Sequence, residues 1–312
     1  MTAAATAPRT ALGRARSWLY VPAHRTEVVA KALAGAADAV VLDLEDAVPA
    51  DAKGAAREAA ASVSPGRLPV WVRINGSGTP WAADDVVALR DAPVDGVRVP
   101  KADDPDAVAA LADRLGRPLH LLLESALGVE RAFELARCHP LVAGLSLGEA
   151  DLAADLRVRG AGLEWARGRV VVAARAAGLP SPVASVWTAL GDPEGLAADS
   201  AAARDAGFFG RSVIHPSQIE PVHRAFTPDP DEVARARELL GSLETAGESA
   251  WVDPRGRFVD PAVVAGARWV VELAETVAAD ADRGPDTRSV SGPHPTDREP
   301  ARRPARAGKE LP

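Results

Sequence analysis

Eight short apolar runs alternate with helix-like segments along most of this chain, in units of about thirty residues. The runs are rich in β-branched or aromatic residues, and most of them end in a charged or polar side chain. They cover residues 17–23, 37–46, 69–75, 96–101, 119–125, 142–148, 181–187 and 209–215. Strands separated by helices are typical of parallel βα units, so this alternation restricts the chain to an α/β fold.

Eight such units spanning about 210 residues predict a closed (β/α)8 barrel, or TIM barrel, over residues 17–227. The alternative is an open doubly wound sheet, which usually carries a G-x-G-x-x-G turn after its first strand. The segment that follows the first run here, VPAHRTEVV, contains no such turn. The barrel is therefore the favoured architecture.

The pattern changes after residue 227. Residues 228–279 are predicted to form a helix, a hairpin and a closing helix. Because the barrel is complete before this point, we expect this C-terminal helical and hairpin extension to pack on the barrel mouth or on a neighbouring subunit. Residues 1–16 are predicted to be a disordered lead, and residues 280–312 a disordered, proline-rich tail.

Composition argues against several classes of partner. The formal net charge of -7 and the pI near 5.5 offer no basic surface for nucleic acid. No apolar run approaches the roughly 18 residues of a membrane span, and the N-terminus has no apolar core long enough for a secretion signal. A single cysteine, Cys138, excludes an internal disulfide and fits a reducing cytoplasm.

Charged side chains gather where the predicted strands end. They are Asp43, Glu45, Asp46, Arg73, Lys101, Glu124, Glu149, Asp151 and His215. In a (β/α)8 barrel the C-terminal ends of the strands form the active-site face. A single acid after a strand is more often a helix cap, but so many acids at one mouth repel one another unless a cation joins them.

The available ligands favour magnesium over zinc, because the acids are carboxylates and no cysteine cluster exists. Glu124 and Asp151 follow neighbouring strands, so both point toward one space. Arg73 is suited to hold a substrate carboxylate or a developing oxyanion. Lys101 has two interpretations: an ion-pair partner for the acids, which we favour, or a Schiff-base lysine.

Several sequence blocks then carry a resemblance to a known family. The blocks VLDLEDAV, VRIN, RVPK, LLES, GEADL and IHPSQI occur in this order, and the similarity covers about residues 17–277. The chain resembles the citrate lyase β-subunit-like family of the HpcH/HpaI aldolase superfamily, which is related to the malyl-CoA and citramalyl-CoA lyases. Trp187 and Thr188 stand where that family often has an aspartate, which suggests a pocket shaped for a different substrate.

The resemblance implies a Mg2+-dependent carbon-carbon lyase, usually a homotrimer or hexamer. Its substrate would be a 3-hydroxyacyl-CoA thioester such as citryl-, malyl- or citramalyl-CoA, cleaved by a retro-Claisen or retro-aldol step, or formed from a keto acid in reverse. It implies two metal ligands, Glu124 and Asp151, with Glu124 also touching substrate, and it places Glu45 and Asp46 near the water shell of the metal. Lys101, as the expected ion-pair partner of the acids, would lie in the same outer group. Arg73 would bind substrate during catalysis.

Asp260 matches a position that, in related lyases, reaches a neighbour's active site from the extension. There it would exchange the proton at the thioester α-carbon. The other interpretation is that Asp260 caps the last helix, with Pro261 in its first turn, and both roles are compatible.

Two alternative functions use the same site. One is malate synthase or malyl-CoA thioesterase activity, in which hydrolysis follows. The other is a β subunit that works only on a carrier-bound acyl group within a multienzyme citrate lyase. Covalent acyl chemistry is not indicated, because no Ser-His-Asp or Cys-His arrangement is evident.

Overall fold

The computed structural model describes residues 13–64, 66–246, 250–253 and 255–282. Its main sheet has seven parallel strands in the spatial order β6-β5-β4-β3-β2-β1-β7. The strands are β1 Ser17–Pro22, β2 Ala39–Asp43, β3 Val70–Arg73, β4 Gly96–Val99, β5 Leu119–Leu123, β6 Val142–Leu147 and β7 Arg211–Val213. Neighbours in the sheet are consecutive in the chain, apart from the β1–β7 pair, so helical crossovers connect them.

The two edge strands of this sheet lie on either side of one short segment. Ser146 of β6 forms a parallel bridge with Val183, and Arg211 of β7 forms one with Ala184. The structure thus confirms the parallel α/β fold and shows a curled, seven-stranded half-barrel. The expected strand at 181–187 is reduced to these two isolated bridges, because Pro182 has no N–H to donate to a ladder.

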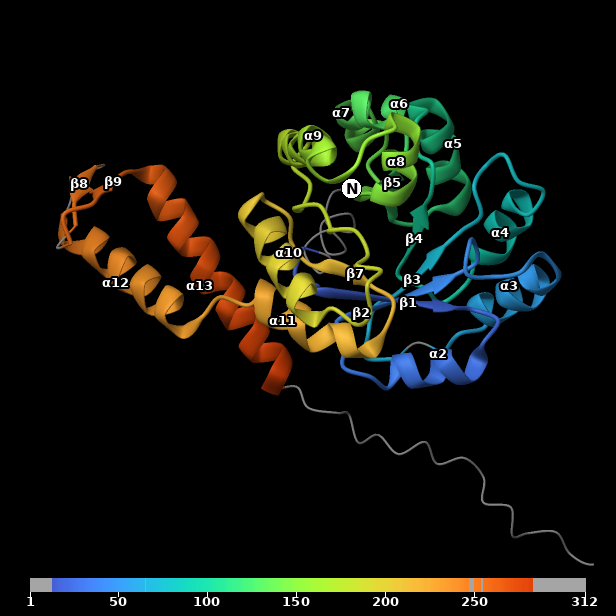
Figure 1. The fold of residues 1–312 in the computed structure, drawn as a ribbon, viewed down its shortest axis with the longest axis horizontal. Helices are drawn as coiled ribbons and strands as arrows, with labels where there is room; N and C mark the ends of the chain where they lie inside the picture. The colour runs from blue at the N-terminus through green and yellow to red at the C-terminus, as the bar shows by residue number, and fades with distance from the viewer. Residues whose placement is uncertain (1–12, 65, 247–249, 254, 283–312) are drawn as a thin grey trace, which may run out of the picture.

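Helices follow the strands and cover the outside of the curled sheet (Figure 1). They are α2 Thr26–Leu33, α3 Lys53–Ala61, α4 Ala82–Leu89, α5 Pro105–Leu115, α6 Ala126–Glu130, α7 Ala132–Arg137, α8 Glu149–Leu156, α9 Glu164–Ala176, α10 Pro193–Asp205 and α11 Ile219–Phe226. Short 3-10 turns cover Ala50–Ala52, Gly160–Leu163 and Pro216–Gln218. Helix α5 shows how local sequence sets the bounds: Asp104 caps its start, and Gly116 ends it in the left-handed conformation.

Two apolar clusters lie on opposite faces of the sheet. The larger one fills the space between the strands and the surrounding helices. The smaller one lies inside the curl and includes Trp18, Trp71 and Val183, with the half-buried Tyr20 packed against it. His120 packs against both tryptophans, tilted toward Trp18 and edge-on to Trp71, at ring-centroid distances of 5.4 and 6.3 Å. Aromatic side chains thus pack against one another inside the curl of the sheet.

The C-terminal extension has its own small core. It consists of α12 Pro230–Ala246, the strand pair β8 Trp251–Val252 and β9 Phe258–Val259, and α13 Pro261–Asp282. Figure 1 shows α12, the hairpin and the first part of α13 projecting away from the sheet. From Trp269 onward α13 packs on the main body, where the Trp269 and Phe209 ring centroids lie 6.0 Å apart. Packing on a neighbouring subunit stays a prediction.

Residues 13–16, at the end of the predicted lead, belong to the described structure. Ala15 is buried, and Arg16 forms an ion pair of 2.9 Å with Asp38. The rest of the predicted lead, residues 1–12, lies outside the described residues, as does the predicted tail from 283 onward. No helix among the described residues is long and apolar enough to cross a membrane.

Candidate functional site

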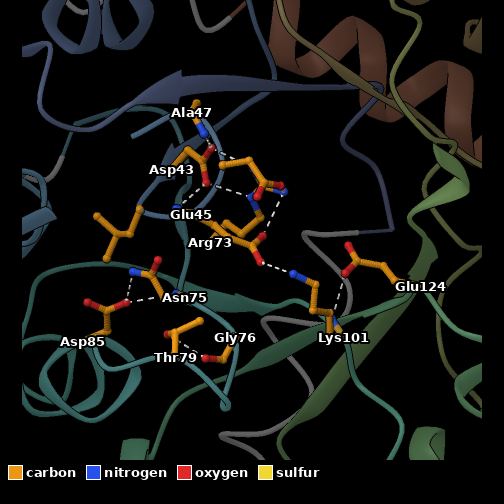
Figure 2. Close-up of polar contacts among 12 residues, drawn as sticks. Asp43, Glu45, Ala47, Arg73, Asn75, Gly76, Thr79, Asp85, Lys101 and Glu124 are labelled. Carbon is orange, nitrogen blue, oxygen red and sulfur yellow. Dashed lines mark hydrogen bonds and ion pairs between the residues drawn. The ribbon is translucent and has the colours of Figure 1, made fainter. Parts of the chain in front are cut away.

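Charged side chains from β2, β3, β4 and β5 meet at the C-terminal edge of the sheet (Figure 2). Because these strands are parallel neighbours, their C-terminal ends lie at the same edge. Figure 2 shows Glu45, Arg73, Lys101 and Glu124 in one continuous set of polar contacts. The structure therefore brings together residues that are distant in sequence.

Arg73 ends β3 and is held by three carboxylates. Its Nε and Nη2 donate to the two oxygens of the buried Asp43, each at 2.7 Å. Its Nη1 lies 3.1 Å from Glu45 and 3.3 Å from the exposed Asp46. Burial opposes the charge on Arg73, but the hydrogen bonds and charge of Asp43 outweigh it and raise the pKa above its usual value. Most of its donors are therefore already committed to protein carboxylates.

Lys101 follows β4 and contacts two acids at once. Its backbone has a φ of 54°, in the left-handed region that a residue with a side chain adopts at some cost. This conformation directs its N–H to Glu124 Oε2 at 3.0 Å, while its Nζ lies 3.2 Å from Glu45 Oε1. The negative charge of Glu45 raises the pKa of Lys101, so the amine stays protonated in this ion pair. A protonated amine is a poor Schiff-base nucleophile.

Glu124 follows β5 and is the acid of the site whose negative charge its surroundings favour least. Its side chain is buried, and Gly148 packs so closely that a Cβ there would lie 2.4 Å from Glu124 Cγ. Burial, then the charges of Glu45 and Asp151, raise the pKa of Glu124 to about 7. Three carboxylates that repel one another form a site that a cation would relieve.

Asp151 and Glu149 both lie in the first turn of α8, but they differ in their partners. Glu149 is held by Arg167, with hydrogen bonds of 3.0 and 2.6 Å to its two oxygens. Asp151 is exposed and close enough to Glu124 for its charge to raise the pKa of that group. Asp151 is therefore the better placed of the two to join Glu124 on a ligand.

These donors fit a magnesium ion. Among the described residues, no three His, Cys, Asp or Glu side chains gather closely enough to hold a metal by themselves. Magnesium usually takes one or two protein carboxylates and completes its shell with water and substrate oxygens. Glu124 and Asp151 supply such a pair, and a cation there would stabilise the Glu124 carboxylate, whose pKa is raised by burial and by the neighbouring charges.

A buried network beside the site was not anticipated from the sequence. Lys53 Nζ donates to the carbonyls of Leu44 and Glu45 at 2.6 and 2.7 Å and to Asn75 Oδ1 at 2.7 Å. Asp85 accepts from both the backbone and side-chain N–H groups of Asn75. This network fixes the backbone from which Glu45 extends.

One sequence signal points to this network. Lys53, Ala56 and Ala60 lie at i, i+3 and i+7, so the lysine shares the buried face of α3. Asp43 was recognised only as a strand-end acid, yet it supplies two of the strongest contacts to Arg73. A lysine on an otherwise apolar helix face is the sequence pattern that predicts buried polar partners for its ammonium group.

Asp260 lies far from these residues in the same chain. Its Oδ1 accepts a hydrogen bond from the Val263 N–H at 3.0 Å at the start of α13. The hairpin that precedes it is at the distal end of the extension in Figure 1. The capping interpretation therefore describes its contacts here, and a role in a neighbour's site stays a prediction.

The comparison with protein families is decisive. Residues 16–216 match the family model described as HpcH/HpaI aldolase/citrate lyase. The chain belongs to the HpcH/HpaI aldolase/citrate lyase family. The matched segment contains Glu45, Arg73, Lys101, Glu124 and Asp151, and it ends before the C-terminal extension.

Individual members of the HpcH/HpaI family extend the similarity beyond that segment. A (3S)-malyl-CoA thioesterase of Cereibacter sphaeroides is 36% identical over 277 residues, covering 85% of this chain and 96% of that protein. The citrate lyase subunit beta of Leuconostoc mesenteroides subsp. cremoris is 33% identical, covering 83% and 93%. An L-malyl-CoA/beta-methylmalyl-CoA lyase of Cereibacter sphaeroides is also 33% identical, covering 85% and 96%.

Solved structures of the family support the same fold. Protein CitE from Mycobacterium tuberculosis, in complex with magnesium, acetoacetate and coenzyme A, has a TM-score of 0.74 and 33% identity, covering 84% of this chain and 98% of that one. The citrate lyase beta subunit from M. tuberculosis, complexed with oxaloacetate and magnesium, has a TM-score of 0.63 and 34% identity, covering 71% and 99%.

Proposed function

We propose that this protein is a Mg2+-dependent lyase that breaks or forms a carbon-carbon bond next to a coenzyme A thioester. The observation that carries the proposal is Glu124, a buried carboxylate whose pKa is raised to about 7 beside Asp151 and Glu45. Relatives named as lyases, and a related structure with magnesium, acetoacetate and coenzyme A, support this chemistry. The substrate would be a 3-hydroxyacyl-CoA thioester such as citryl-, malyl- or citramalyl-CoA.

Each residue of the site has a role in this proposal. Glu124 and Asp151 would hold the ion, which when bound supplies Lewis-acid stabilisation to an oxygen of the keto acid. Lys101 orients Glu124 through its backbone N–H and neutralises Glu45 through its ammonium group. Arg73 would contact substrate by exchanging the exposed Asp46 for a substrate oxygen, while Asp43 holds the guanidinium in place.

The remaining features belong to the assembled protein. We propose that residues 183–184 act as the eighth strand position and close the barrel, because they bridge both sheet edges. Asp260 would reach the site of a neighbouring subunit in a homotrimer or hexamer and carry the proton at the thioester α-carbon. A cytoplasmic location fits the composition.

A matched pair of variants tests the lyase proposal. Glu124→Gln should abolish magnesium-dependent cleavage of malyl-CoA or citryl-CoA, measured as release of the keto acid. Glu149→Gln changes a carboxylate of the same region that is bound by Arg167, and it should retain most activity. Full activity in Glu124→Gln, with cleavage by the wild type, would reject the assignment of the site.

Thioesterase activity is the second candidate, because the (3S)-malyl-CoA thioesterase relatives are 36–37% identical to this chain, whereas the lyase relative is 33% identical. Lyase cleavage of malyl-CoA produces acetyl-CoA and glyoxylate without a free thiol. Hydrolysis produces malate and free coenzyme A. A thiol assay run in parallel with an aldehyde assay therefore distinguishes the two activities.

A third candidate is a subunit that acts only on a carrier-bound acyl group, since one relative is a citrate lyase subunit beta. Turnover of a free coenzyme A thioester by the isolated protein would reject strict dependence on a carrier. Turnover only after addition of an acyl carrier protein would support it.

A further inference from the structure

Arg98 is a buried cation without a carboxylate partner among the described residues. It lies on β4, is 0% exposed, and faces the interior of the curled sheet. Its Nη1 donates to Ser212 Oγ at 3.1 Å and its Nη2 to Ser146 Oγ at 3.0 Å, while its Nε has no hydrogen-bond partner in the part of the chain that the structure describes. Burying a charge is costly unless opposite charge compensates it, and burial lowers the pKa of Arg98 although the charge of Glu124 opposes this, so a further anion nearby would be favoured.

Tyr20 lies between this cation and the site. It is the single tyrosine of the chain and is half-buried near the C-terminal end of β1. The guanidinium carbon of Arg98 lies 5.4 Å from its ring centroid, and that of Arg73 lies 5.3 Å from it. Burial raises the pKa of Tyr20, although Arg98 and Arg73 oppose this, so its hydroxyl remains a hydrogen-bond donor.

The two arginines differ in what they can offer a substrate. Arg73 already gives Nε and Nη2 to Asp43 and has Glu45 and Asp46 at its Nη1. Arg98 gives its hydrogen bonds only to neutral hydroxyls, but it is fully buried and cannot touch a ligand directly. Its positive charge acts on Glu124 at a distance, and the Tyr20 side chain, which contacts both arginines, is the group placed to touch a ligand.

We propose that Tyr20 and Arg98 form the floor of the substrate site and select keto acids that carry a second carboxylate. The Tyr20 hydroxyl donates a hydrogen bond to that carboxylate. Arg98 is a positioning residue, and its charge strengthens this bond in surroundings of low dielectric. This inference rests on the proposed function, because it assumes that a keto acid binds at the same edge of the sheet.

The test compares two acids that differ by one carboxylate. Binding of freshly dissolved oxaloacetate and of pyruvate to the full-length protein is measured by calorimetry with saturating Mg2+. The wild type should bind oxaloacetate at least tenfold more tightly than pyruvate. Tyr20→Phe keeps the ring but removes the hydroxyl, and it should weaken oxaloacetate binding about tenfold or more while pyruvate binding changes less than twofold.

Variants at Arg98 separate charge from packing. Arg98→Met should abolish the preference for oxaloacetate, and Arg98→Lys should restore part of it. In turnover assays these changes should appear in KM for the dicarboxylic acid more than in kcat. Because Tyr20→Phe preserves the packing of β1, it keeps the test valid if Arg98→Met does not fold.

Three outcomes have distinct meanings. Equal binding of the two acids by the wild type, or an unchanged preference in Tyr20→Phe, would overturn the inference while leaving the lyase proposal intact. Binding of neither acid by the magnesium-loaded wild type would overturn the inference, and the release of a keto acid from malyl-CoA or citryl-CoA would then decide the lyase proposal separately. A preference that falls in Tyr20→Phe and Arg98→Met, and returns in Arg98→Lys, would support the inference.

Discussion

Two polar clusters lie beside one another at the C-terminal edge of the sheet, and they are built in opposite ways. In the first, Lys53, Asn75 and Asp85 satisfy one another and the backbone beneath Glu45. In the second, Glu124 receives one hydrogen bond and the repulsion of two other carboxylates. Charged groups that are hydrogen-bonded by their neighbours hold the backbone in place. A carboxylate whose pKa is raised by burial and repulsion indicates instead where a ligand is expected to bind.

The largest expected effect comes from a substitution in the cluster of Lys53, Asn75 and Asp85. Lys53→Met leaves two carbonyls and Asn75 Oδ1 without their shared donor. We expect the free energy of unfolding to fall by about 3–5 kcal/mol, as for the loss of one partner from a buried charged network. Urea denaturation measures it, with Lys31→Met on the exposed side of α2 as the matched control. A loss below about 1 kcal/mol would show that the network carries little stability.

The second prediction concerns Glu124, where we expect a substitution to raise the free energy of unfolding rather than lower it. Glu124→Gln removes a buried negative charge from beside Glu45 and Asp151, so the magnesium-free protein should be more stable at pH 8 by about 1–2 kcal/mol. Thermal unfolding in EDTA checks this gain. Addition of Mg2+ should stabilise the wild type and leave the variant unchanged, since only the wild type keeps both ligands. A variant that unfolds more easily than the wild type in EDTA would contradict the view of Glu124 as a strained ligand.

The contrast also explains what the sequence could predict. Strand-end acids such as Glu124 and Asp151 were visible because each follows an apolar run, and parallel strands bring their ends together. Lys53 and Asp85 lie within helices, so their meeting depends on how α3 and α4 pack, which periodicity alone does not give. Arg98 was hidden in the same way, because alternation along a strand does not tell the inside of a curled sheet from the outside.

The fold shows the same division. Seven of the expected strands form in the described part of the chain, because runs rich in β-branched residues between helices favour buried strands. The exception, residues 181–187, contains a proline whose missing N–H reduces pairing to single bridges. The path of the extension depends on contacts of Trp269 and its neighbours with the main body, which no local signal in 228–279 specifies.

His120 lies among the aromatic side chains inside the curled sheet, and its contribution to stability depends on pH. Burial, then the charge of Arg98, lower its pKa well below 6.5, and its Nδ1 has no hydrogen-bond partner among the described residues. Below pH 6.5 the His120 imidazole binds a proton in the unfolded chain but stays neutral in the folded protein. The free energy of unfolding therefore falls as the pH falls. Between pH 6.5 and 5.5 the loss should be about 1 kcal/mol, because the unfolded histidine is already half protonated at pH 6.5.

Other groups titrate in the same range, so the wild type is compared with His120→Leu at each pH. The difference between the two free energies of unfolding, from urea denaturation, isolates the contribution of this residue. Stability of the wild type relative to the variant should decline on acidification from pH 7 to 5.5. A difference that is constant over this range would mean that His120 accepts its proton in the folded state.

The smallest expected effect on stability separates the two roles of Asp260. Its Oδ1 caps α13, so Asp260→Ala should lower the free energy of unfolding by about 1 kcal/mol. Asparagine caps a helix as well as aspartate does, so Asp260→Asn should stay within about 0.5 kcal/mol of the wild type. Asparagine has no carboxylate, however, and cannot carry a proton from the substrate. If Asp260 acts in a neighbour's site, Asp260→Asn will lose most turnover at nearly full stability; if it is only a cap, Asp260→Asn will remain active.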